Sequence, residues 1–264
     1  MLIVQLSDLH VTAAGHRYAE AVDTNTATRI AVARICDLAP APDVLLLTGD
    51  VAADGRDVEY ACAAAILAPL EGVPRLVLPG NHDAPDRLLR ALPSTLGHEP
   101  GPRLHDAVSV VDGATIVALD TARPPSPHGV LDPAQLRWLE TVLCRTRTPT
   151  VIALHHPPFL TGMSAMDDVG LRDGGEALSG IVSSRDDVLV VCGHVHRVIH
   201  TSIGAARAVS APAAGFQTWL DFVDGSPARL SREDGGFLLH RLASGGCFTT
   251  HAVQTAVSGH QPYP

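Results

Sequence analysis

Short apolar runs that end in polar residues are the main pattern along this chain. Five of these runs are four or five residues long, the length expected of strands that are buried on both faces. They cover residues 2–6, 44–47, 75–78, 151–154 and 188–191. Segments with helical spacing follow the first three runs. This part of the chain therefore predicts the order βαβαβα and a parallel sheet with right-handed crossovers.

The helices are predicted from apolar spacing together with residues that favour helix ends. Residues 26–38 repeat apolar positions at helical spacing after a capping signal at Asp23-Thr24-Asn25, and Pro40 ends the segment. Two more helices begin with proline near the first helical position, where proline is tolerated. Besides the helix at residues 26–38, helices are predicted at residues 57–70, 85–92, 133–144 and 175–183.

The rest of the chain has a different pattern. Residues 107–111 and 114–119 flank Asp112-Gly113, a strong hairpin signal that predicts an antiparallel pair. Residues 157–174 are predicted to be a long loop. Four β-like runs after residue 196 are predicted to form a second, antiparallel sheet. Because the chain shows no repeat or linker, we predict one domain over residues 1–264, with about 205–264 as a candidate cap or oligomerisation segment.

Each of the five apolar runs leads into residues that can bind a metal ion. In chain order these are Asp8 and His10, then Asp50, then Asn81, His82 and Asp83, then His155 and His156, then His194 and His196. Ligands of an open α/β sheet gather at the carboxyl ends of its strands. We therefore expect these side chains to share one edge of the sheet.

The type and number of these residues indicate metal chemistry. Carboxylate, imidazole and amide donors suit Zn²⁺, Mn²⁺ or Fe rather than the all-oxygen cage of Ca²⁺. One catalytic metal takes about three protein ligands and keeps an open position, so the candidates are too many for one ion and fit two that share a carboxylate. Two metals about 3.5–4 Å apart clamp the attacking and leaving oxygens of a phosphoryl displacement.

Composition and charge narrow the function further. The formal net charge is −9, which argues against a broad nucleic-acid groove because such a groove needs clustered Lys and Arg. An anionic substrate stays compatible, since bound cations reverse the local field. Five widely spaced cysteines without a Cys-x-x-Cys predict reduced thiols and a cytoplasmic protein. No apolar run approaches the roughly 20 residues that span a bilayer, so no membrane role is expected.

Five motifs together resemble the motif set of the calcineurin-like metallophosphoesterases. In the order typical of that family they are Asp8-x-His10, Gly49-Asp50, Gly80-Asn81-His82-Asp83, His155-His156-Pro157-Pro158 and Gly193-His194-x-His196. The resemblance spans residues 2 to about 200. Three further features are similar to bacterial glycerophosphodiesterases and class III cyclic-nucleotide phosphodiesterases: Val22-Asp23-Thr24-Asn25, Gly129-x-Leu131 and Met166-Asp167.

The resemblance implies an α/β fold with a metal site at the carboxyl ends of the strands. The expected architecture is a four-layer α/β/β/α sandwich of two mixed sheets with flanking helices. Two divalent or trivalent ions are implied, and Fe, Mn, Zn and Co all remain open. One ion would be held by Asp8, His10, Asp50 and His196, and the other by Asp50, Asn81, His155 and His194, with Asp50 as the bridge.

The resemblance also implies roles around the reacting phosphate. His82 is expected to bind a phosphoryl oxygen or to assist the leaving alkoxide, with Asp83 fixing its tautomer. Asn81 and His196 are further candidates for substrate binding. His156 is expected to support the site rather than to bind metal. Two arginines are candidates to meet a substrate phosphate, Arg123 and Arg197.

The predicted function is hydrolysis of a small-molecule phosphodiester, a 3′,5′-cyclic nucleotide or a glycerophosphodiester, by a metal-bound hydroxide. A phosphomonoesterase or a nuclease on the same site is an alternative, and the acidic charge disfavours the nuclease. A non-catalytic scaffold with this fold is a second alternative, which the presence of all seven candidate ligands disfavours. The expected partner is the substrate, and a homo-oligomer is left open.

Overall fold

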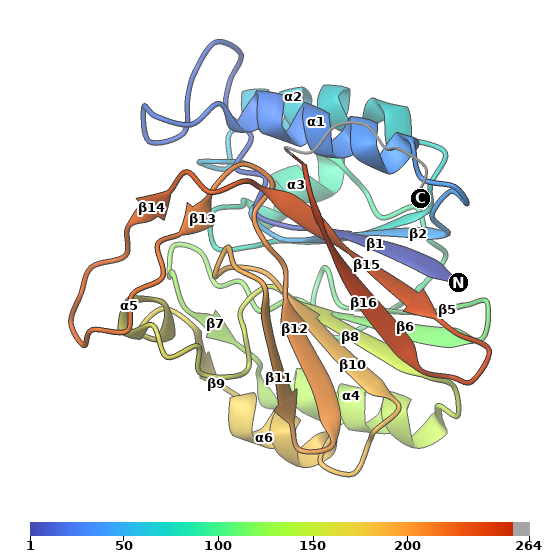
Figure 1. Ribbon diagram of the computed structural model, residues 1–264. Helices are drawn as coiled ribbons and strands as arrows, with labels where there is room; N and C mark the ends of the chain where they lie inside the picture. Colours follow the sequence, from blue (N-terminus) through green and yellow to red (C-terminus); the bar gives the residue numbers. More distant parts are fainter. Residues whose placement is uncertain (256–264) are drawn as a thin grey trace, which may run out of the picture.

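Two large β-sheets pack face to face in the computed structural model, which describes residues 1–255 (Figure 1). The first sheet has the strand order β16-β15-β1-β2-β3. Its bounds are Leu2–Leu6 for β1, Val44–Thr48 for β2, Arg75–Leu78 for β3, Gly236–Leu242 for β15 and Phe248–Gln254 for β16. β1, β2 and β3 are parallel, as predicted, whereas β15 and β16 are antiparallel additions beside β1.

The second sheet is also mixed and has the order β11-β12-β10-β8-β6-β5-β4. Its bounds are Glu99–Pro100 for β4, Ala107–Val111 for β5, Ala114–Leu119 for β6, Thr150–Leu154 for β8, Val188–Cys192 for β10, Ile199–Ile203 for β11 and Ala206–Ser210 for β12. The predicted hairpin is confirmed as β5–β6. β6, β8, β10 and β12 pair in parallel.

The prediction that the four late β-like runs form a sheet of their own is wrong. β11 and β12 extend the second sheet, and β15 and β16 extend the first. β15 contains Phe237 and Leu238, which point to opposite faces and are both fully buried. A strand with two apolar faces is buried on both sides, and the place beside β1 between a helical layer and the other sheet provides this.

Helices cover the outer face of each sheet and complete an α/β/β/α sandwich (Figure 1). The first sheet carries α1 (Thr24–Cys36), α2 (Asp57–Leu67) with its 3-10 extension η1 (Ala68–Leu70), and α3 (Pro85–Ala91). The second sheet carries α4 (Pro133–Arg145) and α6 (Gly175–Ile181). The predicted fold class is therefore confirmed.

Alternation along the strands separates the layers of the core. Ile3 and Leu46 face the space between the sheets, whereas their neighbours Val4 and Leu45 face the helices. All four side chains are at most 2% exposed. This explains why these strands appear in the sequence as continuous apolar runs, since both faces of each strand are covered.

Several short elements lie where a loop was predicted. The segment 157–174 contains α5 (Ser164–Asp167) and β9 (Leu171–Asp173), and β9 pairs with β7 (Gly129–Val130). A second small pair joins β13 (Gln217–Thr218) to β14 (Leu230–Ser231). Elements of two to four residues are too short to produce a periodic pattern. Over the described residues, no helix has the length and apolar character to cross a bilayer.

Candidate metal centre

The polar residues that follow β1, β2, β3, β8 and β10 meet at the seam between the two sheets. Backbone contacts hold the loops together, because Asp8 N–H donates to the carbonyl of Gly49 (3.0 Å) and Gly193 N–H donates to the carbonyl of His155 (2.9 Å). His155 Nδ1 also contacts the carbonyl of Thr48 at 2.8 Å. The ligands thus come from the strand ends of two sheets, where a single sheet edge was expected.

One group of predicted ligands converges on a common point. The ligand atoms of Asp8, His10, Asp50 and His196 all lie within 4.8 Å of one another, and all four residues are buried. His196 Nε2 lies 3.1 Å from His10 Nε2 and 3.3 Å from Asp8 Oδ1. Two imidazole nitrogens and two carboxylates that face each other in a buried site are the donor set of a metal ion.

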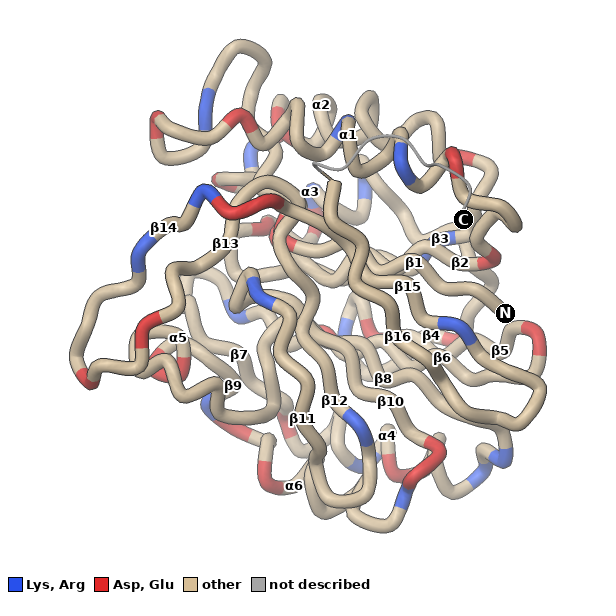
Figure 2. The backbone as a smooth tube through the Cα atoms, viewed as in Figure 1, with Lys and Arg blue, Asp and Glu red and all other residues tan. Residues whose placement is uncertain are grey.

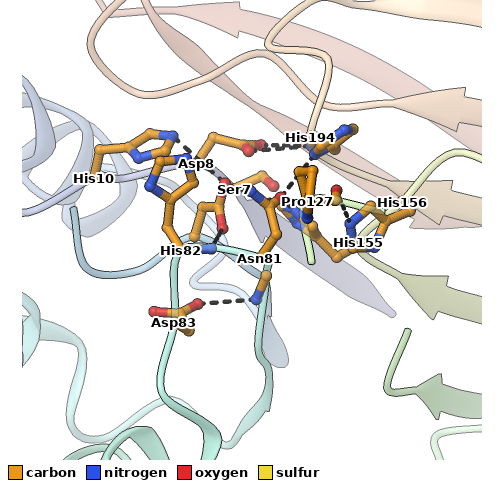
Figure 3. Close-up of polar contacts among 12 residues, drawn as sticks. Ser7, Asp8, His10, Asn81, His82, Asp83, Pro127, His155, His156 and His194 are labelled. Atoms are coloured by element: carbon orange, nitrogen blue, oxygen red, sulfur yellow. Dashed lines mark hydrogen bonds and ion pairs between the residues drawn. The ribbon is translucent and has the colours of Figure 1, made fainter. Parts of the chain in front are cut away.

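A second group adjoins the first through Asp50. Asp50 Oδ2 lies 3.6 Å from His10 Nε2 and 3.5 Å from His155 Nε2. Asn81 Oδ1 lies 3.2 Å from His155 Nε2 and 3.0 Å from His194 Nδ1. Figure 3 shows Asn81, His155 and His194 pointing toward one another. Asp50 therefore lies between two sets of donors.

Five of the proposed ligands have a backbone conformation in the left-handed region of φ and ψ, which non-glycine residues rarely adopt. Asp8, His10, Asp50, His194 and His196 all have positive φ, between 43° and 71°. Only three other non-glycine residues of the described chain share this property. Such conformations cost free energy and persist where the surrounding structure holds them, which is typical of functional sites. Residue types alone do not indicate this feature.

Three glycines allow the ligand loops to approach so closely. A Cβ atom at Gly80 would lie 2.7 Å from Asp50 Cγ, and one at Gly193 would lie 2.6 Å from Asp8 Oδ2. A Cβ at Gly49 would lie 2.7 Å from His155 Cγ. Real Cβ atoms do not tolerate contacts this short, so each glycine is required by the packing of the ligand beside it.

Burial and mutual contact shift the pKa values of the ligands. Burial by itself raises the pKa of Asp8 and Asp50, but the imidazoles of His196 and His155, respectively, outweigh it and lower both. Burial lowers the pKa of His10 and of His194 to about 3. Burial also acts to lower the pKa of His155, but Asp50 outweighs it and raises the value to about 9. Asp8, Asp50, His10 and His194 are thus in the anionic or neutral states that bind metal, whereas His155 would have to give up a proton to an incoming ion.

His82 lies beside the ligands, and its ring is oriented by a backbone group. His82 Nδ1 contacts the carbonyl of Ala53 at 2.7 Å, so this nitrogen carries the proton and donates. Its backbone N–H donates to Asp50 Oδ1 at 2.8 Å. The expectation that Asp83 fixes the His82 tautomer is therefore wrong, because a main-chain carbonyl takes that position.

Asp83 instead holds two ligand loops together from the interior of the protein. Its carboxylate accepts hydrogen bonds from the N–H groups of Gly80, Val51 and Ala52 at 2.9–3.1 Å, and from the Tyr60 hydroxyl at 3.0 Å. It is 2% exposed. Burial, together with the nearby charge of Asp50, raises its pKa to about 6. Asp83 is a positioning residue with no access to the cleft.

His156 and the two predicted arginines are engaged within the protein. His156 Nδ1 accepts from the Thr121 hydroxyl at 2.8 Å, and its Nε2 donates to the carbonyl of Pro127 at 3.2 Å. Arg123 donates to the carbonyls of Asp120 and Ala122 and to the side chain of Gln135. Arg197 pairs with Glu233 at 2.9 Å. Neither arginine lines the cleft beside the ligands.

A cleft of about 370 Å³ opens onto the candidate ligands. Besides His10, Asp50, Asn81, His82, His194 and His196, its lining includes Tyr18, Pro127, Met166, Val169, Phe216 and Arg229. Sequence reasoning did not single out Tyr18, Phe216 or Arg229. Tyr18 lies in an irregular loop and the other two follow the last recognisable motif, so no spacing signal could have found them.

Comparison with known proteins identifies the family. The sequence profile described as calcineurin-like phosphoesterase matches residues 1–198, well over half of the 264 residues. The chain belongs to the calcineurin-like phosphoesterase family. The resemblance inferred from the five motifs is thereby confirmed, and all five motifs fall within the matched segment.

Relatives of this calcineurin-like phosphoesterase carry phosphodiesterase names. It is 31% identical over its full length, and over 96% of the relative, to a probable glycerophosphodiester phosphodiesterase of Arcobacter nitrofigilis. It is 35% identical over 67% of its length to a probable cyclic nucleotide phosphodiesterase of Synechococcus, of which it covers 66%, just under two thirds. A purple acid phosphatase from yellow lupin has the same fold, with a TM-score of 0.63 and 14% identity over 97% of this chain and 52% of that one.

The donor set of this calcineurin-like phosphoesterase fits the metal ions that the family uses. Among the described residues, no Lys or Arg pairs with the buried carboxylates of Asp8 and Asp50, whose basic neighbours are the imidazoles of His10, His155 and His196. Two buried anions need a compensating cation, and a metal ion supplies it. Three histidine nitrogens at the cluster, His10 Nδ1, His194 Nε2 and His196 Nδ1, lack any hydrogen-bond partner among the described residues. The other nitrogen of each ring faces the ligands.

Proposed function

We propose that this calcineurin-like phosphoesterase is a dinuclear metal-dependent phosphodiesterase that acts on small-molecule phosphodiesters. The position of Asp50 carries the proposal, since its Oδ2 lies 3.6 Å from His10 Nε2 and 3.5 Å from His155 Nε2. One carboxylate oxygen thus faces both groups of donors, as a bridging ligand does. The names of the relatives, glycerophosphodiester and cyclic nucleotide phosphodiesterases, support the substrate class.

The ligands divide between two proposed positions. Asp8, His10, Asp50 and His196 would hold one ion, and Asp50, Asn81, His155 and His194 would hold the other. Fe, Mn, Zn and Co all suit nitrogen and oxygen donors of this kind. When bound, the ions supply Lewis acidity toward the phosphoryl oxygens and toward water.

His82 is proposed as the residue that acts on the substrate. Because its Nδ1 donates to the carbonyl of Ala53, Nε2 is free to face the cleft. In the protonated ring, Nε2 donates a hydrogen bond to a phosphoryl oxygen and then a proton to the leaving alkoxide. Asn81 and His196 also line the cleft and are proposed to contact the substrate phosphate. Asp83 holds the loop that carries Asn81 and His82 against the loop after Asp50.

The distribution of charge favours a small substrate. Arg positions are dispersed among Asp and Glu along the backbone, and no basic stripe crosses the face of the described chain seen in Figure 2. A nuclease on this site would lack a surface that neutralises many phosphates.

All five cysteines are free thiols, which supports the prediction of a reducing, cytoplasmic location. The single domain, the role of residues after about 205 and a homo-oligomer stay predictions.

The test is metal content together with hydrolysis of bis(p-nitrophenyl) phosphate, for the wild type and Asp50→Asn. The wild type is expected to bind two metals per chain and to turn over the diester. Asp50→Asn should fall below one metal per chain and lose turnover. The control is Asp112→Asn, a hairpin-turn position outside the cleft where Asn also accepts positive φ.

Each alternative has its own outcome. Equal metal content and turnover in the wild type and Asp50→Asn would defeat the bridging role. Turnover of p-nitrophenyl phosphate with none of the diester would indicate a phosphomonoesterase. Bound metal without hydrolysis of either ester would indicate a scaffold.

A further inference from the structure

Two aromatic side chains that the proposed metal chemistry does not use form one wall of the cleft. The rings of Tyr18 and Phe216 are stacked, with centroids 5.0 Å apart and planes inclined by 20°. Phe216 lies behind the proposed ligands, with its centroid 4.6 Å from that of His196 and 5.7 Å from that of His10. Tyr18 is half-buried and lies 4.6 Å from His10. The wall therefore begins at the ligands and includes a ring that reaches solvent.

The Asp23-Thr24-Asn25 motif anchors the segment that carries Tyr18. The Thr24 hydroxyl donates to the carbonyl of His10 at 2.8 Å. The Asn25 side chain accepts from the N–H of Thr12 at 2.9 Å and donates to the carbonyl of Thr12 at 3.0 Å. The motif at the start of α1 thus clamps the backbone directly after a proposed ligand, where the loop to Tyr18 begins.

The turn after Tyr18 contains two residues in a backbone conformation that they do not favour. Tyr18 and Val22 exchange two backbone hydrogen bonds, of 2.9 Å and 3.0 Å. The two residues after Tyr18, Ala19 and Glu20, have φ of 47° and 57°, a region that glycine adopts readily and these residues do not. Strain of this kind is retained where the surroundings over-determine it, and here it places an aromatic ring in the cleft.

Among the other side chains of the cleft, Thr218 carries a hydroxyl that a polar substrate arm could meet, and the rest leave few partners for such an arm. Pro127, Met166 and Val169 also line the cleft and carry no hydrogen-bonding side-chain group apart from a thioether. Arg229 is paired with Asp221. Gln217 already donates to the carbonyls of Ala213 and Asp234. An aromatic face with apolar neighbours suits a planar ring better than a glycerol arm.

We infer that Tyr18, backed by Phe216, binds a planar aromatic group of the substrate, so that the substrate class is a phosphodiester that carries a nucleobase or an aryl ring. This inference rests on the proposed phosphodiesterase function and narrows its two substrate classes to one. Tyr18 sets specificity through its ring, and its hydroxyl has no partner among the described residues, which leaves it available to the substrate.

The first test compares kcat/KM for 3′,5′-cyclic AMP, bis(p-nitrophenyl) phosphate and glycerophosphoethanolamine. Base stacking on an aromatic side chain corresponds to a factor of about 10 to 100 when the ring is removed. In Tyr18→Leu, kcat/KM for cyclic AMP divided by kcat/KM for glycerophosphoethanolamine should fall by about this factor. The change should come mainly from a higher KM for cyclic AMP. Tyr18→Phe should keep the ratio. The matched control is Phe222→Leu, which removes a 64%-exposed ring outside the cleft lining and should also keep it.

Two results would overturn the inference in this test. An equal loss on all three esters, with metal content reduced, would show that the ring only supports His10. A wild-type preference for glycerophosphoethanolamine would show that the aromatic wall does not select the substrate. A loss for bis(p-nitrophenyl) phosphate but not for cyclic AMP would assign the wall to aryl esters and against nucleobases.

The second test measures binding without turnover. AMP and glycerol 3-phosphate are titrated calorimetrically into the Mn²⁺-loaded wild type and Tyr18→Leu. AMP should bind the wild type at least about tenfold more tightly than glycerol 3-phosphate does, and Tyr18→Leu should lose most of this difference. Absence of hydrolysis with all esters would defeat the proposed function, while the titration still decides the role of Tyr18. Equal affinity of the two ligands for the wild type would overturn the inference.

Discussion

Replacement of Gly80 by alanine tests whether the ligand loops are packed as tightly as the structure shows. Gly80 does not have a positive φ, so alanine is compatible with its backbone and the effect is steric. The new Cβ would lie 2.7 Å from Asp50 Cγ and nearer still to Oδ1, the oxygen that accepts the His82 N–H. The Cβ would also lie closer to the Asp50 backbone nitrogen than to Cγ, so the Asp50 backbone as well as its carboxylate must move away, and the hydrogen bond to His82 is lost.

The expected magnitude follows from the size of this displacement. A misplacement on the order of 1 Å in a catalytic geometry costs about 10²-fold in rate, which is about 2.7 kcal/mol of barrier. Overpacking a rigid site also lowers the free energy of unfolding by about 1–3 kcal/mol. For a chain of this size that corresponds to a fall in Tm of about 2–10 °C.

The assay combines metal content, thermal unfolding and hydrolysis of bis(p-nitrophenyl) phosphate. Gly72→Ala is the matched control, because a Cβ there meets nothing within 4 Å and the backbone again needs no positive φ. The control should keep its metal, its Tm and its rate. A folded Gly80→Ala protein with wild-type metal content and rate would refute the reasoning, because the Asp50 carboxylate would then have room that the structure denies.

Two further predictions concern a substrate-facing and a structural histidine. His82→Ala is expected to keep its metal content and to lose turnover by about 10²–10⁴-fold, and loss of metal together with activity would instead make His82 a ligand. His240 is fully buried between Gln5 and Thr250, and burial lowers its pKa to about 3 from an ordinary value of 6.5, with a smaller contribution from His200. Below about pH 6.5 the unfolded chain takes up a proton that the folded chain refuses, so His240 contributes stability above this pH and loses about 1.4 kcal/mol per pH unit below it. Denaturant titrations of the wild type and His240→Gln should therefore converge between pH 6.5 and about pH 5, and a constant difference would contradict the assignment.

The sequence by itself determined the local elements and the chemistry of the site. A strand with both faces covered is mostly apolar, and this property makes β1, β2, β3, β8 and β10 recognisable from their residues alone. Metal ligands must carry carboxylate, imidazole or amide groups, and such residues follow the same five strands. Both properties belong to single residues and their immediate neighbours, so they can be read along the chain.

Only the tertiary structure decided which distant segments meet. Pairing partners are chosen by the packing of whole faces, which placed β15 beside β1 and brought the ligands together from two sheets. The same folding brought Phe216 onto Tyr18, almost two hundred positions away, and gave His82 a carbonyl partner where a carboxylate was expected. Contacts of this kind depend on distances between elements, which residue type and spacing do not encode. The metal chemistry could therefore be predicted from the sequence, whereas the aromatic wall of Tyr18 and Phe216 could be recognised only from the tertiary structure.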